Sequence, residues 1–385
     1  MEIRYIDTEK ALDEANALVV GMRRLALDIE AAGFHRYDDR LSLVQLTAGP
    51  VTLLLDPFTL PLDEFLRPVL EDPGVEIVMH GSDYDLRLLD RDLSIRPQNL
   101  FDTQVAATLL GHQGIGLAAL LERYFGVKLS KKFQRADWAQ RPIPPEMREY
   151  AARDTMHLEE LADLLGGELN EMGRMAWAAE EFEELRKIRY SEPRTEDPVA
   201  RVKAARDMEP VEVARLREAL AWRDGIARER DRAPFRVAHD GVLVAVARQN
   251  PGTVDALSGV QGLNGNLARG EGDALVERFA RINQLPEEEL VPYPRPPRGS
   301  GRGRPDPVVE ERFLRLKEVR NRLAGELGLD RGTLLPNSLL QSLADAPPDS
   351  MEAMAAVEGM RSWQIEVAGS QLLESLQPPA SAGRC

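Results

Sequence analysis

The stretch LALDIEAAGFHRYDDRLSLVQLT, residues 25–47, contains two short apolar segments that predict neighbouring β-strands. The first segment carries Asp28 and Glu30 within an otherwise apolar run. Because side chains alternate along a strand, two acids separated by one residue point to the same face of the sheet. Charges in such a run are poor structural choices, which favours a functional role for the pair. An edge strand with one face in solvent is the structural alternative.

The segments around this stretch predict a domain in which strands and helices are mixed. The expected elements are a helix at 8–20 capped by Thr8, a strand at 51–56 after a hairpin turn at Gly49-Pro50, and a strand at 76–80. A short apolar segment, LFDT at 100–103, comes next, and helical patterns dominate from there to about residue 189. This order predicts an α/β domain with a mixed sheet in residues 1–190.

A third acid, Asp85, lies at the third position of the helix expected after the strand at 76–80. Ser82 precedes it by three residues, a spacing that is typical of a capping box at the start of a helix. The helix dipole also favours an acid at this position, so a purely structural role is the alternative. Asp83 is the neighbouring candidate for any functional role.

Tyr150 and Asp154 are four residues apart in a predicted helix, so they lie on one helix face. A surface pair is the structural alternative. Four carboxylates gathered at one point repel one another unless positive charge lies among them, and divalent metal ions are the usual solution. If Asp28, Glu30, Asp85 and Asp154 meet in the fold, they therefore predict a metal site for phosphodiester cleavage.

The order of these residues, a strand Asp-x-Glu, a helix-start Asp and a helical Tyr-x-x-x-Asp, resembles the DEDD exonucleases of the tyrosine-bearing subclass. The flanking sequences sharpen this to a resemblance to the ribonuclease D family across about residues 20–165. The stretches that carry it are LALDIEAAGFHRYDDRLSLVQLT (25–47), MHGSDYDLRLLDRDL (79–93), LFDTQVAATLLG (100–111) and KKFQRADWAQRPIPPEMREYAARDTMHL (131–158).

This resemblance implies a ribonuclease-H-like exonuclease fold that degrades RNA from its 3′ end and releases nucleoside 5′-monophosphates. It also implies two divalent ions, Mg²⁺ or Mn²⁺, as cofactors. Asp28, Glu30, Asp85 and Asp154 match the family's metal-binding positions, and Tyr150 matches the residue that orients the attacking water. The substrates it implies are structured RNA 3′ ends such as those of tRNA precursors.

The loop before the Tyr150 helix resembles the family's substrate-side segment, where cations and amides contact phosphate. The candidate substrate-binding residues in it are Lys131, Gln134, Arg135 and Arg141. A solvated basic loop is the alternative, and Trp138 is a candidate for the core. Asp102 is expected to cap the helix that follows it, and His80 is expected to have a structural role.

From about residue 208 the patterns become entirely helical. Residues 208–284 and, less closely, 308–376 resemble HRDC domains, which are helical nucleic-acid-binding modules. A Pro/Gly/Arg-rich linker at 285–307 separates them, and a tail at 377–385 is expected to be disordered. The candidate nucleic-acid-binding residues of the first block are Arg223, Arg228, Arg230, Arg232 and Arg236, with a charge-balanced solvated face as the alternative. The linker adds Arg295, Arg298, Arg302 and Arg304 as candidates for phosphate contact.

The composition limits the other possibilities. Residues 1–190 carry most of the net charge of −15, so local basic patches, rather than a basic protein as a whole, would hold RNA. No stretch approaches the roughly 20 apolar residues of a membrane span. The N-terminus has no apolar signal core and the single cysteine, Cys385, excludes an internal disulfide, so a cytoplasmic protein without membrane contact is expected.

The sequence therefore predicts a metal-dependent 3′–5′ exoribonuclease with an α/β ribonuclease-H-like domain, followed by two all-α HRDC-like domains. Two alternatives stay open. One is a single-strand DNA 3′–5′ exonuclease in repair, since no residue can be identified that must read the 2′-hydroxyl group. The other is a nucleic-acid-binding scaffold that no longer cuts, although a scaffold has no need of a repulsive carboxylate cluster. The sequence does not determine the oligomeric state or the preferred metal.

Overall fold

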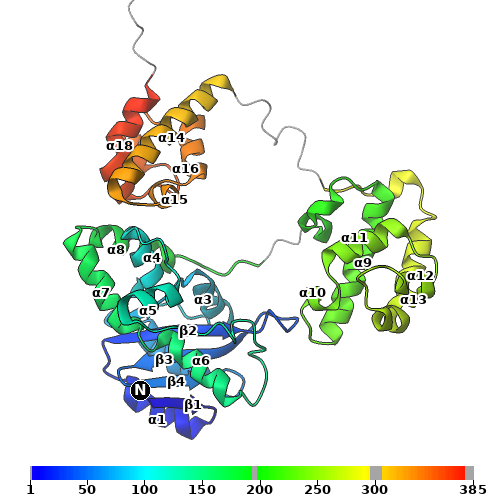
Figure 1. The fold of residues 1–385 in the computed structure, drawn as a ribbon, viewed down its shortest axis with the longest axis horizontal. Coiled ribbons are helices and arrows are strands. Elements are labelled where there is room, and N and C mark those ends of the chain that lie inside the picture. The colour runs from blue at the N-terminus through cyan, green and yellow to red at the C-terminus, as the bar shows by residue number, and fades with distance from the viewer. Residues whose placement is uncertain (1, 193–196, 295–305, 378–385) are drawn as a thin grey trace, which may run out of the picture.

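The computed structural model describes residues 2–192, 197–294 and 306–377, and it contains a six-stranded sheet flanked by helices, followed by two groups of helices (Figure 1). The strands, in their order across the sheet, are β1 (Glu2–Ile6), β4 (Val51–Leu55), β3 (Leu41–Ala48), β2 (Arg24–Ala31), β5 (Glu76–Met79) and β6 (Leu100–Asp102). β2 and β4 pair antiparallel with β3, whereas the other pairs are parallel. The predicted mixed sheet is confirmed, as is the hairpin between β3 and β4.

Helices cover both faces of this sheet, and together with it they form the sheet domain (residues 2–192). They are α1 (Glu9–Val19), α2 (Leu62–Leu70), α3 (Asp83–Leu88) with a π-helical turn at Leu89–Leu93, α4 (Thr103–Leu109), α5 (Leu117–Phe125), α6 (Pro145–Thr155), α7 (Leu158–Glu171) and α8 (Met175–Arg186). The Thr8 hydroxyl accepts a hydrogen bond from the backbone N–H of Ala11, so the predicted cap of α1 is confirmed.

The side chains of the central strand β2 point alternately to the two faces of the sheet. Leu25 and Leu27 are buried in the core beneath α1 and α2, whereas Ala26 belongs to the core that includes α4 and α7. Because side chains alternate along a strand, Asp28 and Glu30 point to the same face as Ala26. α6 packs over β3 and β4 on that face, which brings a helix next to the two acids.

The first helical group has a hydrophobic core of its own around Leu216, Trp222 and Phe279. Its helices are α9 (Pro210–Glu229), α10 (Pro234–Val237), α11 (Asp240–Gln249), α12 (Val254–Ser258) and α13 (Gly265–Ile282), with 3₁₀ turns at Pro198–Arg201, Lys203–Ala205 and Glu287–Glu289. Pro210 occupies the first turn of α9, where a backbone N–H would have no acceptor within the helix, so its absence in proline costs no hydrogen bond.

The second helical group shares a core with the sheet domain. Its helices are α14 (Pro307–Leu327), α15 (Arg331–Leu334), α16 (Asn337–Asp345), α17 (Met351–Ala355) and α18 (Ser362–Leu376). Trp363 at the start of α18 stacks on Trp177 of α8, with ring centroids 4.9 Å apart and planes 18° from parallel. The Glu180 carboxylate accepts hydrogen bonds from Ser362 N at 2.7 Å and Trp363 N at 3.1 Å, so α8 supplies the cap of α18. One continuous hydrophobic cluster therefore joins the two.

Two further expectations concern segments that the structure describes in part. In the linker predicted at 285–307, the described residues form only the short turn at Glu287–Glu289 before α14 begins. The linker arginines Arg295, Arg298, Arg302 and Arg304, and the tail beyond residue 377, lie outside the described residues. Among the residues that are described, no helix has the length and apolar character needed to cross a membrane.

Candidate active site

Three elements bring the predicted acidic residues to one place. β2 carries Asp28 and Glu30, the first turn of α3 carries Asp85, and α6 carries Asp154. Carboxylate oxygens of Asp28, Glu30 and Asp154 lie within 4.8 Å of one another. Burial and the nearby charge of Asp28 raise the pKa of Asp85, which links the fourth carboxylate to the same group. We call these four residues the carboxylate cluster.

The end of β2 is shaped around the first two of these acids. Asp28 lies opposite Gln45 of β3, and Glu30 lies opposite Leu43. The pairing register then shifts between Glu30 and Ala31, which marks a β-bulge. A bulge bends the strand and re-aims the side chains beside it, and such bulges are common next to functional sites. The chain therefore leaves the sheet immediately after it has presented both carboxylates.

Asp85, and not Asp83, belongs to the cluster. Asp85 is buried, whereas the Asp83 side chain is 60% exposed and pairs with Arg87 at 3.0 Å. The predicted capping box at the start of α3 is wrong, because the Ser82 hydroxyl makes no cap hydrogen bond. It donates instead to the carboxylate of Asp102 at 2.8 Å, a charged acceptor that forms the stronger hydrogen bond.

Asp102 is fully buried and fixes the turn from which α3 starts. As predicted, it caps α4 by accepting hydrogen bonds from Gln104 N and Val105 N, at 2.8 and 3.1 Å. It also accepts from Gly81 N and from both the N–H and the hydroxyl of Ser82. Gly81 has a φ of +67°, a conformation that glycine adopts without strain. One carboxylate thus ties β6, the turn after β5 and α4 together behind the cluster.

We expect Asp102→Ala to lower the free energy of unfolding by about 3–5 kcal/mol, because the substitution leaves several buried N–H groups without acceptors. Urea-induced unfolding followed by circular dichroism measures this change. Asp83→Ala removes an exposed acid next to the same turn, so it is the control and should change stability by no more than about 0.5 kcal/mol. Equal stability of the two variants would contradict the assigned role of Asp102.

Tyr150 lies one helical turn before Asp154 on α6. Its ring packs against Phe133 and Trp138, with centroids 5.8 and 6.1 Å away, and Trp138 is buried in the core as the structural interpretation predicted. Burial and the charges of the nearby carboxylates raise the pKa of the Tyr150 hydroxyl, so it stays protonated at neutral pH. Within residues 2–192, this hydroxyl donates to no protein acceptor, which leaves it available to a water or a substrate oxygen.

The cluster is electrostatically strained without a cation. Burial raises the pKa of Asp28 to about 7, and burial together with the charge of Asp28 raises the pKa of Asp154 to about 8. Burial and neighbouring carboxylates also hold the pKa values of Glu30 and Asp85 well above their usual range. In the part of the chain that the structure describes, no lysine or arginine lowers any of these four pKa values. An all-oxygen donor set without a counter-charge fits hard divalent cations.

A pocket of about 170 Å³ opens beside Asp154 and Tyr150. Its other walls include Leu129, Phe133, Lys132 and Arg153. Sequence reasoning missed both cations. Arg153 lies three residues after Tyr150 on the same helix, and this spacing was the available signal.

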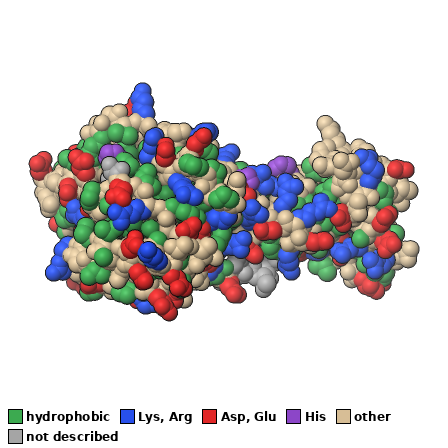
Figure 2. Space-filling model, turned by 90° about the horizontal axis from the view of Figure 1, so that it is seen from below, with side chains coloured by type: hydrophobic (Ala, Val, Ile, Leu, Met, Phe, Trp, Pro, Cys, Tyr) green, Lys and Arg blue, Asp and Glu red, His purple; other side chains and the backbone are tan. Residues whose placement is uncertain are grey.

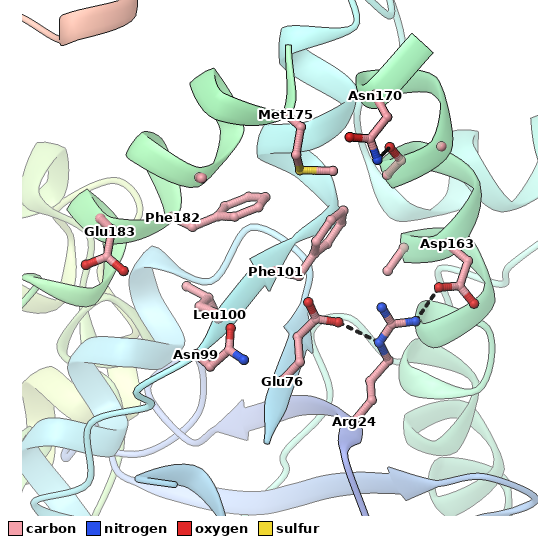
Figure 3. A pocket seen from close by; sticks show the side chains of 14 residues that line it. Arg24, Glu76, Asn99, Leu100, Phe101, Asp163, Asn170, Met175, Phe182 and Glu183 are labelled. Atoms are coloured by element: carbon pink, nitrogen blue, oxygen red, sulfur yellow. Dashed lines mark hydrogen bonds and ion pairs between the residues drawn. The ribbon is translucent and has the colours of Figure 1, made fainter. Parts of the chain in front are cut away.

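A larger pocket, of about 410 Å³, lies at the opposite end of β2 from the acids (Figure 3). Phe101 and Phe182 give it an apolar wall, and Arg24 at its rim forms ion pairs with Glu76 and Asp163 (Figure 3). Because its one arginine is already paired with two acids, the pocket offers little to a phosphate group, and we do not assign it to the chemistry.

Arg141 does not fit the substrate-binding role predicted for it. Its guanidinium pairs with the buried carboxylate of Asp56, at 2.5 and 2.8 Å, and donates to the backbone oxygens of Ser42 and Trp138. A guanidinium whose nitrogens are all engaged within the fold has no donor left for phosphate. Lys131, Gln134 and Arg135 are exposed, and they remain candidates for substrate contact.

The arginines predicted to bind nucleic acid in the first helical group have different surroundings. Arg223 is 13% exposed and pairs with Asp240, and Arg230 pairs with Glu271, so both serve the domain's own structure. Its burial leaves little of Arg223 for RNA, whereas Arg230 is exposed despite its ion pair and stays a prediction. The other three, Arg228, Arg232 and Arg236, lie at the end of the group that faces the sheet domain.

Gln45 is a buried polar residue that sequence reasoning missed. Its side chain is 0% exposed, and neither its amide nitrogen nor its amide oxygen has a hydrogen-bond partner among the described residues. It lies opposite Asp28 on the neighbouring strand, on the face that carries the cluster. An unpaired buried amide is rare, so its place beside Asp28 indicates a link to the site. The signal in the sequence was an amide side chain inside the largely apolar run LSLVQLT.

Family models and a curated relative match most of the chain. Residues 3–170 match the model of a 3′-5′ exonuclease domain, and residues 212–278 and 309–376 each match the model of the HRDC domain. The chain is 31% identical over 361 residues to ribonuclease D of Pseudomonas paraeruginosa, and the match covers 92% of both chains.

Solved structures align with almost the whole chain, including a structure of ribonuclease D. A protein from Bifidobacterium adolescentis aligns with a TM-score of 0.82 at 25% identity, over 97% of this chain and 99% of that one. Escherichia coli RNase D, described as an exoribonuclease involved in structured RNA processing, aligns with a TM-score of 0.68 at 27% identity, over 98% and 99% of the two chains. The predicted architecture, an α/β exonuclease domain followed by two HRDC regions, is confirmed.

Proposed function

Since the chain belongs to the ribonuclease D family and is a 3′–5′ exoribonuclease, we propose that it trims the 3′ ends of structured RNA, including tRNA precursors, with two Mg²⁺ or Mn²⁺ ions. The observation that supports this proposal is the convergence of Asp28, Glu30 and Asp154 within 4.8 Å next to a protonated tyrosine, with Asp85 close enough for the charge of Asp28 to raise its pKa. The role in structured RNA processing given for the E. coli relative supports the substrate class. A cytoplasmic location fits the single cysteine.

In the proposed mechanism, Asp28, Glu30, Asp85 and Asp154 would hold the ions through their carboxylate oxygens. Bound there, the ions would lower the pKa of water and stabilise the negative charge that develops on the phosphate and the departing 3′ oxygen. The Tyr150 hydroxyl donates a hydrogen bond that orients the attacking water in line with the scissile P–O bond. Attack breaks the bond to the 3′ oxygen of the preceding nucleotide and releases a nucleoside 5′-monophosphate.

The remaining residues of the proposal hold the RNA. Lys131 and Gln134 contact phosphates near the cluster, and the HRDC regions support the body of the substrate. Salt should weaken this binding, because each phosphate contact releases condensed counterions.

A time course on 5′-labelled RNA and DNA of the same sequence, in Mg²⁺, in Mn²⁺ and in EDTA, tests the proposal. A metal-dependent ladder that shortens from the 3′ end, faster on RNA, is the expected result. A transcript of a tRNA with a 3′ extension should be trimmed up to the folded body and no further. Equal or faster cleavage of DNA would favour a DNA exonuclease in repair, and no cleavage of either polymer would favour a binding scaffold.

A further inference from the structure

The loop between β2 and β3 (residues 32–40) connects the strand that carries the acids to the first helical group. It leaves the sheet directly after the bulge and contacts the segment that follows α9 (Figure 1). Ala233 N donates to His35 O at 3.0 Å, and Arg236 Nε donates to Phe34 O at 2.7 Å. The first helical group is therefore held against the loop that follows the strand carrying Asp28 and Glu30.

Two arginines from distant parts of the sequence meet on the ring of Phe34. The guanidinium carbons of Arg236 and Arg135 lie 4.7 and 5.6 Å from its centroid. The centroids of the Phe235 and Phe34 rings lie 5.5 Å apart, and each of these residues is 38% exposed. With the exposed neighbours His239 and Arg232, these residues form what we call the bridge surface: Phe34, Arg135, Arg232, Phe235, Arg236 and His239.

The arginines of the bridge surface have no acidic partners. Across residues 2–192, 197–294 and 306–377, Arg135, Arg232 and Arg236 form no ion pair, and Arg236 donates only to Phe34 O and His35 Nε2. Nearby arginines that serve the fold are paired, as Arg36 is with Asp137 at 2.8 Å. Figure 2 shows Lys, Arg and His side chains gathered where the larger and smaller bodies of the molecule meet. A local surplus of positive charge is unusual in a protein with a net charge of −15.

We propose that the bridge surface binds the single-stranded segment of the RNA substrate that lies directly 5′ of the nucleotides being removed. Exposed aromatic rings next to unpaired arginines bind single-stranded RNA well, because its bases stack on the rings and its phosphates contact the cations. In a duplex the bases stack on one another, so they are not available to stack on Phe34 or Phe235. The inference rests on the proposed function, since the polarity of the strand follows from a 3′ end at the carboxylate cluster.

A purely structural contact between two domains explains only part of this surface. It accounts for Arg236, whose guanidinium bonds to the backbone of the loop. It does not account for Arg232, because its exposed side chain forms no hydrogen bond or ion pair with any described residue. A structural contact between the domains also does not explain why Arg135 lies over the Phe34 ring without an acidic partner.

The test compares two double variants of the full-length protein that lose the same charge. R135Q/R232Q removes two cations from the bridge surface without breaking an ion pair. R248Q/R281Q, the control, removes two exposed arginines near the other end of α9, where Arg215 contacts Ala247 and Asn283. The probe is a single-stranded RNA of about 12 nucleotides, a length within the usual footprint of such surfaces.

We expect R135Q/R232Q to raise the KM for this RNA by about tenfold with kcat nearly unchanged. Binding in EDTA, followed by fluorescence anisotropy, should show a salt dependence that is shallower by about 0.7 for each phosphate that the variant no longer binds. The control variant should have the KM and the salt dependence of binding of the wild type. Equal KM and equal salt dependence for the two variants would overturn the inference while leaving the exonuclease intact. A wild-type protein that shortens no RNA would overturn the proposed function itself.

Discussion

Asp28→Asn is expected to reduce the rate of RNA cleavage by at least about 1,000-fold, because it removes a central ligand of the proposed metal site while preserving size. The same substitution should raise the melting temperature of the metal-free protein. It replaces a buried carboxylate, whose pKa is raised to about 7 by burial, with a neutral amide next to two other acids. Each kcal/mol of repulsion relieved corresponds to about 2–4 °C. Loss of activity together with a gain of stability is the signature of a functional site.

Two variants serve as controls for this result. Asp83→Asn changes an acid of the same helix turn as Asp85, but one that is exposed and paired with Arg87, so activity should stay within about twofold. Tyr150→Phe keeps all four carboxylates, so Mg²⁺ or Mn²⁺ should still stabilise it against heat while turnover falls. Single-turnover cleavage and thermal unfolding, each with and without metal, give both readouts. An Asp28→Asn enzyme that keeps a tenth of the wild-type rate would refute the assignment.

The melting temperature of the metal-free protein is expected to fall as the pH rises from about 4 to about 8. Asp28 and Asp154 have folded-state pKa values of about 7 and about 8, against a usual value of 3.8. Between these limits the unfolded chain has lost protons that the folded protein still holds, so stability decreases with rising pH. Below the lower limit both states are protonated, and the penalty is absent.

Divalent metal should reverse this trend. The carboxylates must lose their protons to bind an ion, so the stabilisation by excess Mg²⁺ or Mn²⁺ grows across the same pH window. Thermal unfolding in EDTA and in metal, at several pH values, gives two curves that diverge as the pH rises. Asp28→Asn should flatten both curves. A melting temperature in EDTA that rises between pH 5 and pH 8 would show that the cluster is not strained in the folded protein.

Local patterns in the sequence predicted correctly which side chains share a face. The alternation of β2 placed Asp28 and Glu30 on one face, and the spacing on α6 placed Tyr150 next to Asp154. These patterns succeed because backbone geometry alone decides which side chains share a face. That the three elements converge on one point came from the family resemblance, since no local pattern specifies which helix packs over which strand.

Interactions between segments far apart in the sequence account for the errors. Arg141 resembled a free cation because its partner, Asp56, lies on a different segment that gives no local sign of a buried carboxylate. The Ser82 hydroxyl bonds to Asp102 rather than to its own helix for the same reason. The link between Gln45 and the site follows only from the sheet register, which sets Gln45 opposite Asp28. The meeting of Arg135 and Arg236 on one ring likewise depends on how two domains pack.

The core shared by α8 and α18 affects how the protein is made. On the ribosome, Trp177 emerges long before Trp363, its stacking partner in the finished protein. At roughly 5–20 residues per second, the interval is on the order of 10–40 s. Throughout that time the nascent sheet domain has an uncovered apolar surface, to which chaperones and other nascent chains bind. Translation must reach α18 before that surface is closed, so transcripts that stop before α18 should yield chains that are prone to aggregate.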